Sequence, residues 1–505
     1  MSSKAANQGR LVGAGFSRQR AHGLTAIGMV LAYLLFSPLL DVLGFPSSFA
    51  AVSLMDWQRI FELITAALVV LLLAPAIIAY DPVGVVATQW QVVGWTVFFA
   101  LGALSSVMAK IPLLAFLEWS WTLLWFSTTV LLVVSAPSRE SLRDILSTWT
   151  LAVLASYSML FYVGNSDALF DPSSFLSMRF PGFNNVRVFA DYQTVVLCFA
   201  PYAIAYRVTG SLWRALGWVL VGLYAALAIA SGSRSLLLGQ FVAWATVVFF
   251  LRRSAIPFIR GQLWLWLIGG ATYGLLFVLL PMMGDSVGHA FSPFLRFDSS
   301  RRSELWQIAA SMFLSDPMLG IGPGHFAVFP NVIAASPHNQ VLQVLAEWGG
   351  VAGSIFIVLI VQFAVRGLRS LSQSGGYMPE SDAHFSAAAT AALMALLVQS
   401  LVSPVFNNPA SQMMLSLLAV VYVRAVPLPF EQVRLAIGRP VAVVAMVAVV
   451  LTAYLVAPWV SRIAERNQCY LSLHDKPTSH FAPRFWQQGW IFSPCDWICP
   501  NSSDN

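Results

Sequence analysis

Long apolar segments recur along the chain and are separated by short polar stretches. They fall near residues 23–44, 59–79, 91–108, 112–134, 146–164, 191–208, 213–230, 235–251, 262–283, 348–366, 384–403, 411–424 and 440–459. About 20 consecutive apolar residues cross a bilayer as a helix, and a helix satisfies its own backbone hydrogen bonds there. The pattern predicts an all-α integral membrane protein with about 13 transmembrane helices. The range is 12–14, because the third and fourth segments are separated by very little.

The composition agrees with this prediction. Of the 505 residues 58% are apolar and only 10% are charged, with a mean hydropathy of +0.73, whereas soluble domains carry roughly 25% charged residues. The first apolar segment is long and no small-residue cleavage site follows it. We therefore expect a retained first span and not a signal peptide.

The distribution of positive charge predicts the orientation in the membrane. Lys and Arg are enriched in short cytoplasmic loops. The N-terminal segment and the loops on its side of the membrane carry 16 cations. The short loops opposite hold five, namely Arg59, Lys110, Arg179, Arg187 and Arg234. The N-terminus is therefore expected in the cytoplasm, and the long loop and C-terminal tail on the outer side.

This alternation divides the chain into five parts. They are a cytoplasmic N-terminus (1–22), a bundle of nine spans (23–283), a large outer loop with the candidate chemistry (284–347), a bundle of spans ten to thirteen (348–459) and an outer tail (460–505). The tail contains Cys469, Cys495 and Cys499, where disulfides are permitted, and their pairing stays open. Cys198 lies in a span and is expected to be a small buried apolar residue.

The stretch "SPHNQVLQVLAEWGG" (336–350) combines a polar beginning with an apolar periodicity. Ser336 suits an N-cap and Pro337 the first helical position, which would place His338 in the first helical turn. The positive helix end disfavours an imidazolium there, so we expect a neutral His338 that can act as a base. The alternative is a boundary histidine that only caps the helix.

Three polar residues follow His338 at helical spacing. Asn339, Gln343 and Glu347 form a stripe on one helix face,. Such a stripe at a membrane boundary predicts a cavity lining or a contact with a partner helix. As a cavity lining, the three residues are candidates for substrate binding. The alternative is that the amides are merely hydrated among lipid headgroups.

Arginines on the outer side form a second group of candidates. Arg187 lies in "NNVRVFADYQ", Arg234 in "SGSRS", and Arg302 in "RRSELWQ". Guanidinium groups bind phosphate oxygens in a bidentate manner. The alternative is contact with lipid headgroups or pairing with Asp191, Asp298 or Glu304, which we favour for Arg301. Arg234 lies between two spans, where a charge is expensive without a purpose.

Several function classes lack support in the sequence. "GIGPGHF" (320–326) lacks the Lys-Ser/Thr of a phosphate-binding loop, and no zinc or carboxylate motif at metal spacing is present,. We expect no cofactor, no metal and no nucleic-acid partner. Charged residues are absent from the middle of the predicted spans, which disfavours an ion-coupled transporter.

In these residues the chain resembles the O-antigen ligase/polymerase family of bacterial membrane glycosyltransferases. The matching pieces are "SGSRS" (231–235), "RSELWQIAASMFLSDPMLGIGPGHF" (302–326) and "HNQVLQVLAEWG" (338–349). The family pattern places an Arg one turn ahead of a Trp and then a Pro-x-x-Gly-x-Gly run. These places are filled by Arg302, Trp306, Pro317, Gly320 and Gly322. The third piece also resembles the pilin-modifying and protein O-oligosaccharyltransferase branch.

The resemblance implies a GT-C-like membrane enzyme of the bacterial inner membrane. It would transfer a glycan from undecaprenyl diphosphate to an acceptor hydroxyl or amine at the periplasmic face, with inversion and without a metal. Arg234 and Arg302 would grip the diphosphate, and His338 would be the essential histidine. Asn339 would hold the acceptor or the ring, and the glycine run would either approach the substrate or simply close the loop.

Acceptor identity stays open. The partners implied are the lipid-linked glycan, membrane lipids and an acceptor that is lipid A–core, a growing glycan or a pilin-like protein. Alternatives of other classes are a transporter of lipid-linked glycans and a non-catalytic scaffold.

Overall fold

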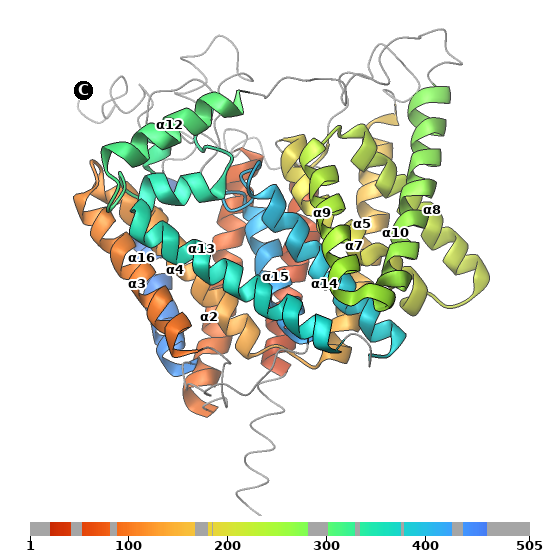
Figure 1. Cartoon of the computed structure of the whole chain (residues 1–505), viewed down its shortest axis with the longest axis horizontal. Coiled ribbons are helices and arrows are strands. Elements are labelled where there is room, and N and C mark those ends of the chain that lie inside the picture. Colours follow the sequence, from red (N-terminus) through yellow and green to blue (C-terminus); the bar gives the residue numbers. More distant parts are fainter. Residues whose placement is uncertain are drawn as a thin grey trace, which may run out of the picture.

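The computed structural model describes residues 21–41, 53–80, 88–166, 180–183, 185–280, 301–328, 334–374, 378–426 and 438–461. All regular secondary structure in these ranges is helical (Figure 1). The all-α prediction is confirmed. Arg179, Asp298, the three cysteines of the tail and residues 1–20 lie outside the described residues.

The helices follow in chain order. They are a first helix within Ala21–Leu40, η1 (Ser37–Asp41), α2 (Leu54–Tyr80), α3 (Gln89–Met108), α4 (Pro112–Val134), α5 (Arg139–Gly164), α7 (Val186–Arg207), α8 (Ser211–Ala230), α9 (Arg234–Leu251), η4 (Arg252–Ala255), α10 (Ile256–Tyr273), η5 (Gly274–Leu279), α12 (Arg302–Ser315), η6 (His325–Val328), α13 (Gln340–Ser374), α14 (Glu380–Gln399), α15 (Pro409–Ala425) and α16 (Gly438–Val460). Each of the predicted spans overlaps one of them.

The described residues hold 11 helical segments that are long and apolar enough to cross a membrane. The segment Arg234–Leu279 counts as one, although the 3-10 turn η4 interrupts it, where Arg252 has φ 50°. Helix α15, with 17 residues, falls just below the required length. The helices therefore form a polytopic membrane protein. The predicted number of 13 transmembrane helices stays a prediction.

Capping residues explain why some helices begin before their apolar segments. Helix α5 begins at Arg139, although the apolar run begins near 146, because the Ser138 side chain accepts a hydrogen bond from the Ser141 N–H. In the same way the Asn185 side chain accepts a hydrogen bond from the Arg187 N–H at the start of α7. Such N-caps satisfy donors that the helix itself leaves open.

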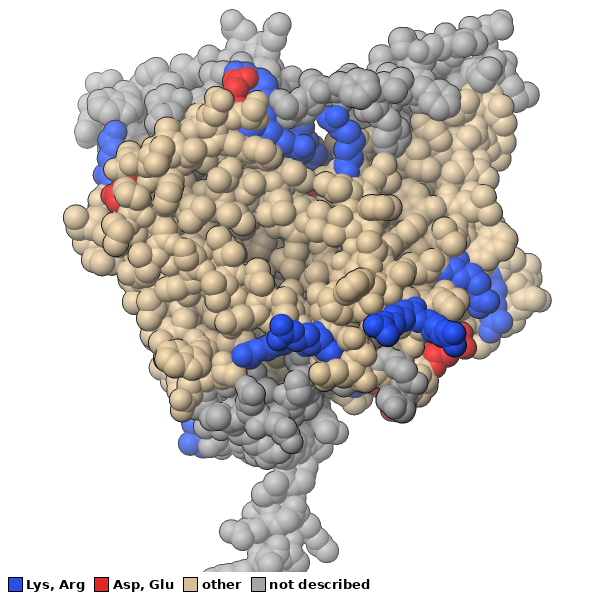
Figure 2. All heavy atoms as spheres, in the orientation of Figure 1, with Lys and Arg blue, Asp and Glu red and all other residues tan. Residues whose placement is uncertain are grey.

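Helix α7 lies at the centre of the bundle. Its residues from Phe189 to Ile204 are all buried, which is the pattern of a helix that is packed on every side. It packs against α5, α8 and α14, while α3, α4 and α16 form the opposite side of the bundle (Figure 1). Lys and Arg gather at two edges of the molecule, with a wide uncharged belt between them (Figure 2).

Helix α13 is broken at Gly349, which has φ 83° and ψ 171°. A short segment up to Trp348 precedes the break, and a long segment then crosses the bundle diagonally (Figure 1). A Cβ at Gly349 would lie 2.2 Å from the Met318 carbonyl oxygen, so only glycine fits this position.

The glycine-rich run after α12 covers this break. The N–H groups of Ile321 and Gly322 donate to the carbonyls of Ala346 and Glu347 (both 3.0 Å), at the end of the short segment of α13. Helix ends leave such carbonyls without intrahelical partners. Of the two roles predicted for the run, these contacts support the turn that closes the loop.

Candidate functional site

His338 lies immediately before α13 and not in its first turn. The helix begins at Gln340, and the Asn339 side chain accepts a hydrogen bond from the Leu342 N–H at 3.0 Å, as an N-cap does,. The predicted start at Ser336 and Pro337 is therefore wrong. His338 has φ 53°, a left-handed conformation that no residue adopts inside an α-helix.

The backbone of His338 is strained, and such strain costs about 1–3 kcal/mol and clusters at functional sites. The ring Nδ1 lies 3.1 Å from the Ser336 carbonyl oxygen. Because a carbonyl can only accept, Nδ1 carries the proton of the neutral ring, and Nε2 keeps a lone pair. The proton-accepting nitrogen, Nε2, is therefore the one that does not contact Ser336.

The electrostatic surroundings keep His338 neutral. The pKa of His338 is lowered to about 4, mainly by burial and also by the positive charges of Arg187 and Arg302, against the opposing hydrogen bond to Ser336. The lowered pKa supports the expected neutral imidazole, but its main cause is burial and not the helix terminus. An imidazole with this pKa accepts a proton only transiently at neutral pH.

Three arginines from separate helices interact with one another near this histidine, and two of them, Arg187 and Arg302, act on His338 directly. Arg187 is in the first turn of α7, while Arg234 and Arg302 are the first residues of α9 and α12. Burial lowers the pKa of Arg302, and repulsion by Arg187 and Arg234 lowers it further. We call Arg187, Arg234 and Arg302 the three-arginine cluster. The structure thus brings together residues that lie up to 115 positions apart.

The cluster combines charge with helix termini. All three arginines stand at helix N-termini, whose free N–H groups and positive dipole ends favour anions. The Arg302 Nε is buried and has no hydrogen-bond partner among the described residues. Buried donors are rarely left in this state. The arrangement suits a ligand with several negatively charged oxygens.

The neighbouring Arg301 has different surroundings, although it also stands at the N-terminus of α12. It is exposed, and its guanidinium pairs with Glu304 on the same helix, with Nη2 and Oε2 2.7 Å apart. This is the surface pairing that the sequence analysis favoured for Arg301. Arg301 therefore forms a surface ion pair, whereas Arg302, the next residue, belongs to the three-arginine cluster.

The polar stripe of α13 contacts protein and not a cavity. Gln343 is buried and exchanges two hydrogen bonds with Asn407 (3.2 and 3.0 Å). The buried Glu347 accepts a hydrogen bond from the Phe326 N–H at 2.9 Å. Of the two roles predicted for the stripe, contact with another part of the protein is the one observed. The assignment of Asn339, Gln343 and Glu347 as substrate-binding residues stays a prediction.

Trp306 follows Arg302 by one turn. It packs against an apolar cluster that includes Leu305, Ala309 and Phe326, and its indole Nε1 is buried without a hydrogen-bond partner in the described part of the chain. The spacing of the Arg and the Trp therefore puts two buried N–H donors on the same stretch of α12.

The sequence analysis missed the loop between α14 and α15. Ser400, Ser403 and Asn407 of this loop contact α7 and α13. The loop carries no charge, so its sequence gave no sign of a functional position. Across the described residues, no group of three or more His, Cys, Asp or Glu gathers as a metal site would require, and the independence from metals stays a prediction.

A comparison with known families matches one segment of the chain. Residues 219–357 match the family model Wzy_C, described as O-Antigen ligase. None of the curated proteins matches the chain. The matched segment contains Arg234, Arg302 and His338, while Arg187 lies outside it. Over residues 219–357 the chain is therefore similar to the O-antigen ligase family, a family of glycosyltransferases of the ligase or polymerase type.

Proposed function

We propose that this protein transfers a glycan from undecaprenyl diphosphate to an acceptor at the periplasmic face of the bacterial inner membrane. The observation that carries the proposal is the three-arginine cluster near a neutral His338. The basic residues at two edges of the molecule support a membrane-embedded enzyme whose site faces one side,.

The chemistry follows from these groups. The acceptor oxygen attacks the anomeric carbon of the donor sugar, and the bond between this carbon and the phosphate oxygen breaks. A single displacement inverts the configuration at that carbon. The three arginines and the helix N-termini stabilise the charge that grows on the departing diphosphate. No acid is then needed on the leaving oxygen.

His338 receives the proton of the acceptor. Its Nε2 has a lone pair because Nδ1 faces the Ser336 carbonyl, and general bases of this kind contribute about 10²–10⁴-fold in rate. We propose lipid A–core as the leading acceptor. A pilin-like protein or a growing glycan would use the same donor site.

The experiment is complementation of a deletion strain with wild type, His338→Ala, Arg302→Ala or Arg301→Ala. Membrane levels of each variant are measured, and the mobilities of lipopolysaccharide and of pilin are compared in the same cells. We expect loss of one glycosylated product with the first two variants and none with Arg301→Ala. The lost product identifies the acceptor.

Full activity of both His338→Ala and Arg302→Ala would contradict the proposal. A transporter of lipid-linked glycans or a scaffold would then be the better explanation. Transfer by the purified protein in the presence of a chelator tests the predicted independence from metals.

A further inference from the structure

The loop between α14 and α15, residues 400–408, contacts α13, which begins two residues after His338, and α7, which carries Arg187. The Ser400 carbonyl accepts the N–H of Gln340, two residues after His338, at 2.9 Å. The Ser403 hydroxyl donates to the buried carboxylate of Asp191, at 3.1 and 3.2 Å. Asp191 lies one turn after Arg187 on α7. The loop thus joins the start of α7 to the start of α13.

A reciprocal amide pair holds the loop against α13. Gln343 Nε2 donates to Asn407 Oδ1 at 3.2 Å, and Asn407 Nδ2 donates to Gln343 Oε1 at 3.0 Å. The two side chains are only 6% and 5% exposed. Removing one amide would leave the other buried without a partner, which is costly. The pair therefore fixes both the distance and the orientation of the short segment of α13.

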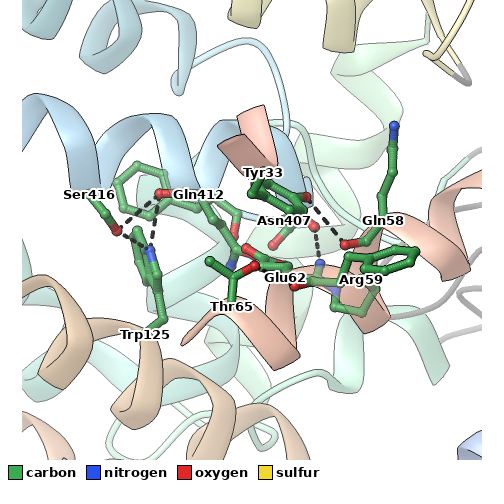
Figure 3. Close-up of polar contacts among 11 residues, drawn as sticks. Tyr33, Gln58, Arg59, Glu62, Thr65, Trp125, Asn407, Gln412 and Ser416 are labelled. Carbon is green, nitrogen blue, oxygen red and sulfur yellow. Dashed lines mark hydrogen bonds and ion pairs between the residues drawn. The ribbon is translucent and has the colours of Figure 1, made fainter. Parts of the chain in front are cut away.

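A buried arginine of α2 fixes the other side of the loop (Figure 3). Arg59, 1% exposed, donates through Nη2 to the Asn407 carbonyl and through Nη1 to Gln412 Oε1, each at 2.5 Å. Its Nη1 also pairs with Glu62 at 2.5 Å, and its guanidinium lies 5.5 Å from the Trp121 ring. A planar guanidinium presents several donors in fixed directions, so Asn407 is held from both its backbone and its side chain.

We infer that the 400–408 loop, anchored by Arg59 at Asn407, positions His338 relative to the three-arginine cluster. Gln343 and Asn407 are then positioning residues, and the substrate contact predicted for Gln343 is replaced by a structural one. The inference rests on the proposed function. Its physical basis is that a displacement of about 1 Å at a reacting group costs about 100-fold in rate.

Asn407→Ala is the test variant and Asn408→Ala is its matched control. Asn408 is the next residue and is equally buried, at 4%. Its Nδ2 has no hydrogen-bond partner among the described residues, and its side chain does not cap α15. Both substitutions therefore remove the same atoms from neighbouring buried positions, but only one removes the bond to α13.

Two measurements are made on each purified variant. The first is transfer from an undecaprenyl-diphosphate-linked glycan, for which we expect kcat of Asn407→Ala to fall about 10- to 100-fold. The KM for the donor should stay within about twofold, because the arginines are intact. The second is hydrogen exchange of amides 340–345, which should be faster in Asn407→Ala and unchanged in Asn408→Ala.

An exchanged pair provides the rescue. The double variant Gln343→Asn/Asn407→Gln keeps two facing amides and their summed length, so it should recover most of the kcat that either single exchange loses. If the single substitutions lowered kcat only by destabilising the fold, kcat should be lower still in the double variant.

Equal kcat and equal exchange in Asn407→Ala and Asn408→Ala would overturn the inference, and so would a double variant without recovery. The proposed function fails in a different way. If His338→Ala transfers glycan as wild type does, the proposed function is wrong and the loop has no role at an active site. Faster exchange in Asn407→Ala would then still support the mechanical link to α13.

Discussion

Two groups of arginines at opposite ends of the bundle have opposite surroundings. At one end Arg139 and Arg143 share the carboxylate of Asp382, and Arg139 also donates to the Ser386 hydroxyl at 2.9 Å. At the other end the charged neighbours that shift the pKa of Arg302 are two further arginines. Both groups lie at or near helix N-termini, where a cation is unfavourable.

The difference separates a structural role from a binding role. At the first end Asp382 supplies the negative charge, and its ion pairs with Arg139 and Arg143 link α5 to α14. In the three-arginine cluster Arg187 and Arg234 repel the guanidinium of Arg302 beside a neutral histidine, and a bound anion would reduce this repulsion. Mutual repulsion between arginines is therefore a better indicator of the proposed anion-binding site than the number of arginines.

The largest expected effect is on Arg302. Arg302→Ala should lower kcat/KM for glycan transfer about 100- to 1,000-fold, because it removes a fixed donor from the developing phosphate charge. Arg302→Lys should recover only part of this, because an ammonium is not bidentate. Arg301→Ala, one position away, should transfer as wild type does. Equal losses in the two alanine variants would remove the distinction between paired and clustered arginines.

Arg59 tests what happens when an internal pair is broken. Arg59→Met leaves the buried Glu62 without its partner and should lower the free energy of unfolding by about 3–5 kcal/mol. The double variant Arg59→Met/Glu62→Leu should be close to wild type in stability, because hydrophobic replacement of a buried pair is often neutral.

The same double variant should still transfer glycan slowly, because the Asn407 carbonyl has lost its donor. Thermal unfolding in detergent and transfer per folded protein are the measurements. Wild-type rates in the double variant would show that Arg59 acts on stability alone.

A substitution of Asp382 tests the structural role of its ion pairs with Arg139 and Arg143. Asp382→Asn removes the charge that two arginines share and should lower the free energy of unfolding by about 2 kcal/mol. Transfer per folded molecule should be unchanged, because the site lies at the other end of the bundle. A specific loss of transfer at normal stability would mean that the two ends are coupled.

The smallest effect is on the pH dependence. Because the pKa of His338 is lowered to about 4, kcat/KM should fall only as the pH drops through about 4, well below the ordinary histidine value of roughly 6.5. The lowered pKa also means that the unfolded chain binds more protons between pH 6.5 and 4. This histidine therefore makes the fold less stable as the pH falls through that range.

Arg187→Gln removes one of the charges that lower the pKa of His338. The acidic limb of kcat/KM should therefore move to higher pH, by a small amount because burial, the larger cause, stays. Asp382→Asn serves as the control and should leave the limb in place. If kcat/KM of the wild type instead fell near the ordinary histidine pKa, the prediction of a neutral His338 base at lower pH would be contradicted.

Much of the fold could be predicted because the bilayer imposes one simple rule. Segments of about 20 apolar residues must be helical to satisfy their backbone, and α2, α8 and α16 lie close to where the apolar runs are. Helix beginnings were less predictable. Polar N-terminal turns such as that of α5 do not look like membrane spans, and the left-handed His338 delays the start of α13.

The sequence by itself determined the all-helical membrane fold, the candidate residues Arg187, Arg234, Arg302 and His338, and the spacing of Arg302 and Trp306. Only the tertiary structure decided that the three arginines meet, since α7, α9 and α12 are far apart along the chain. It also decided that Gln343 pairs with Asn407 and that Arg59 is buried beneath that pair. The physical reason is that hydropathy depends on neighbours along the chain, whereas burial, repulsion and paired hydrogen bonds depend on neighbours in space.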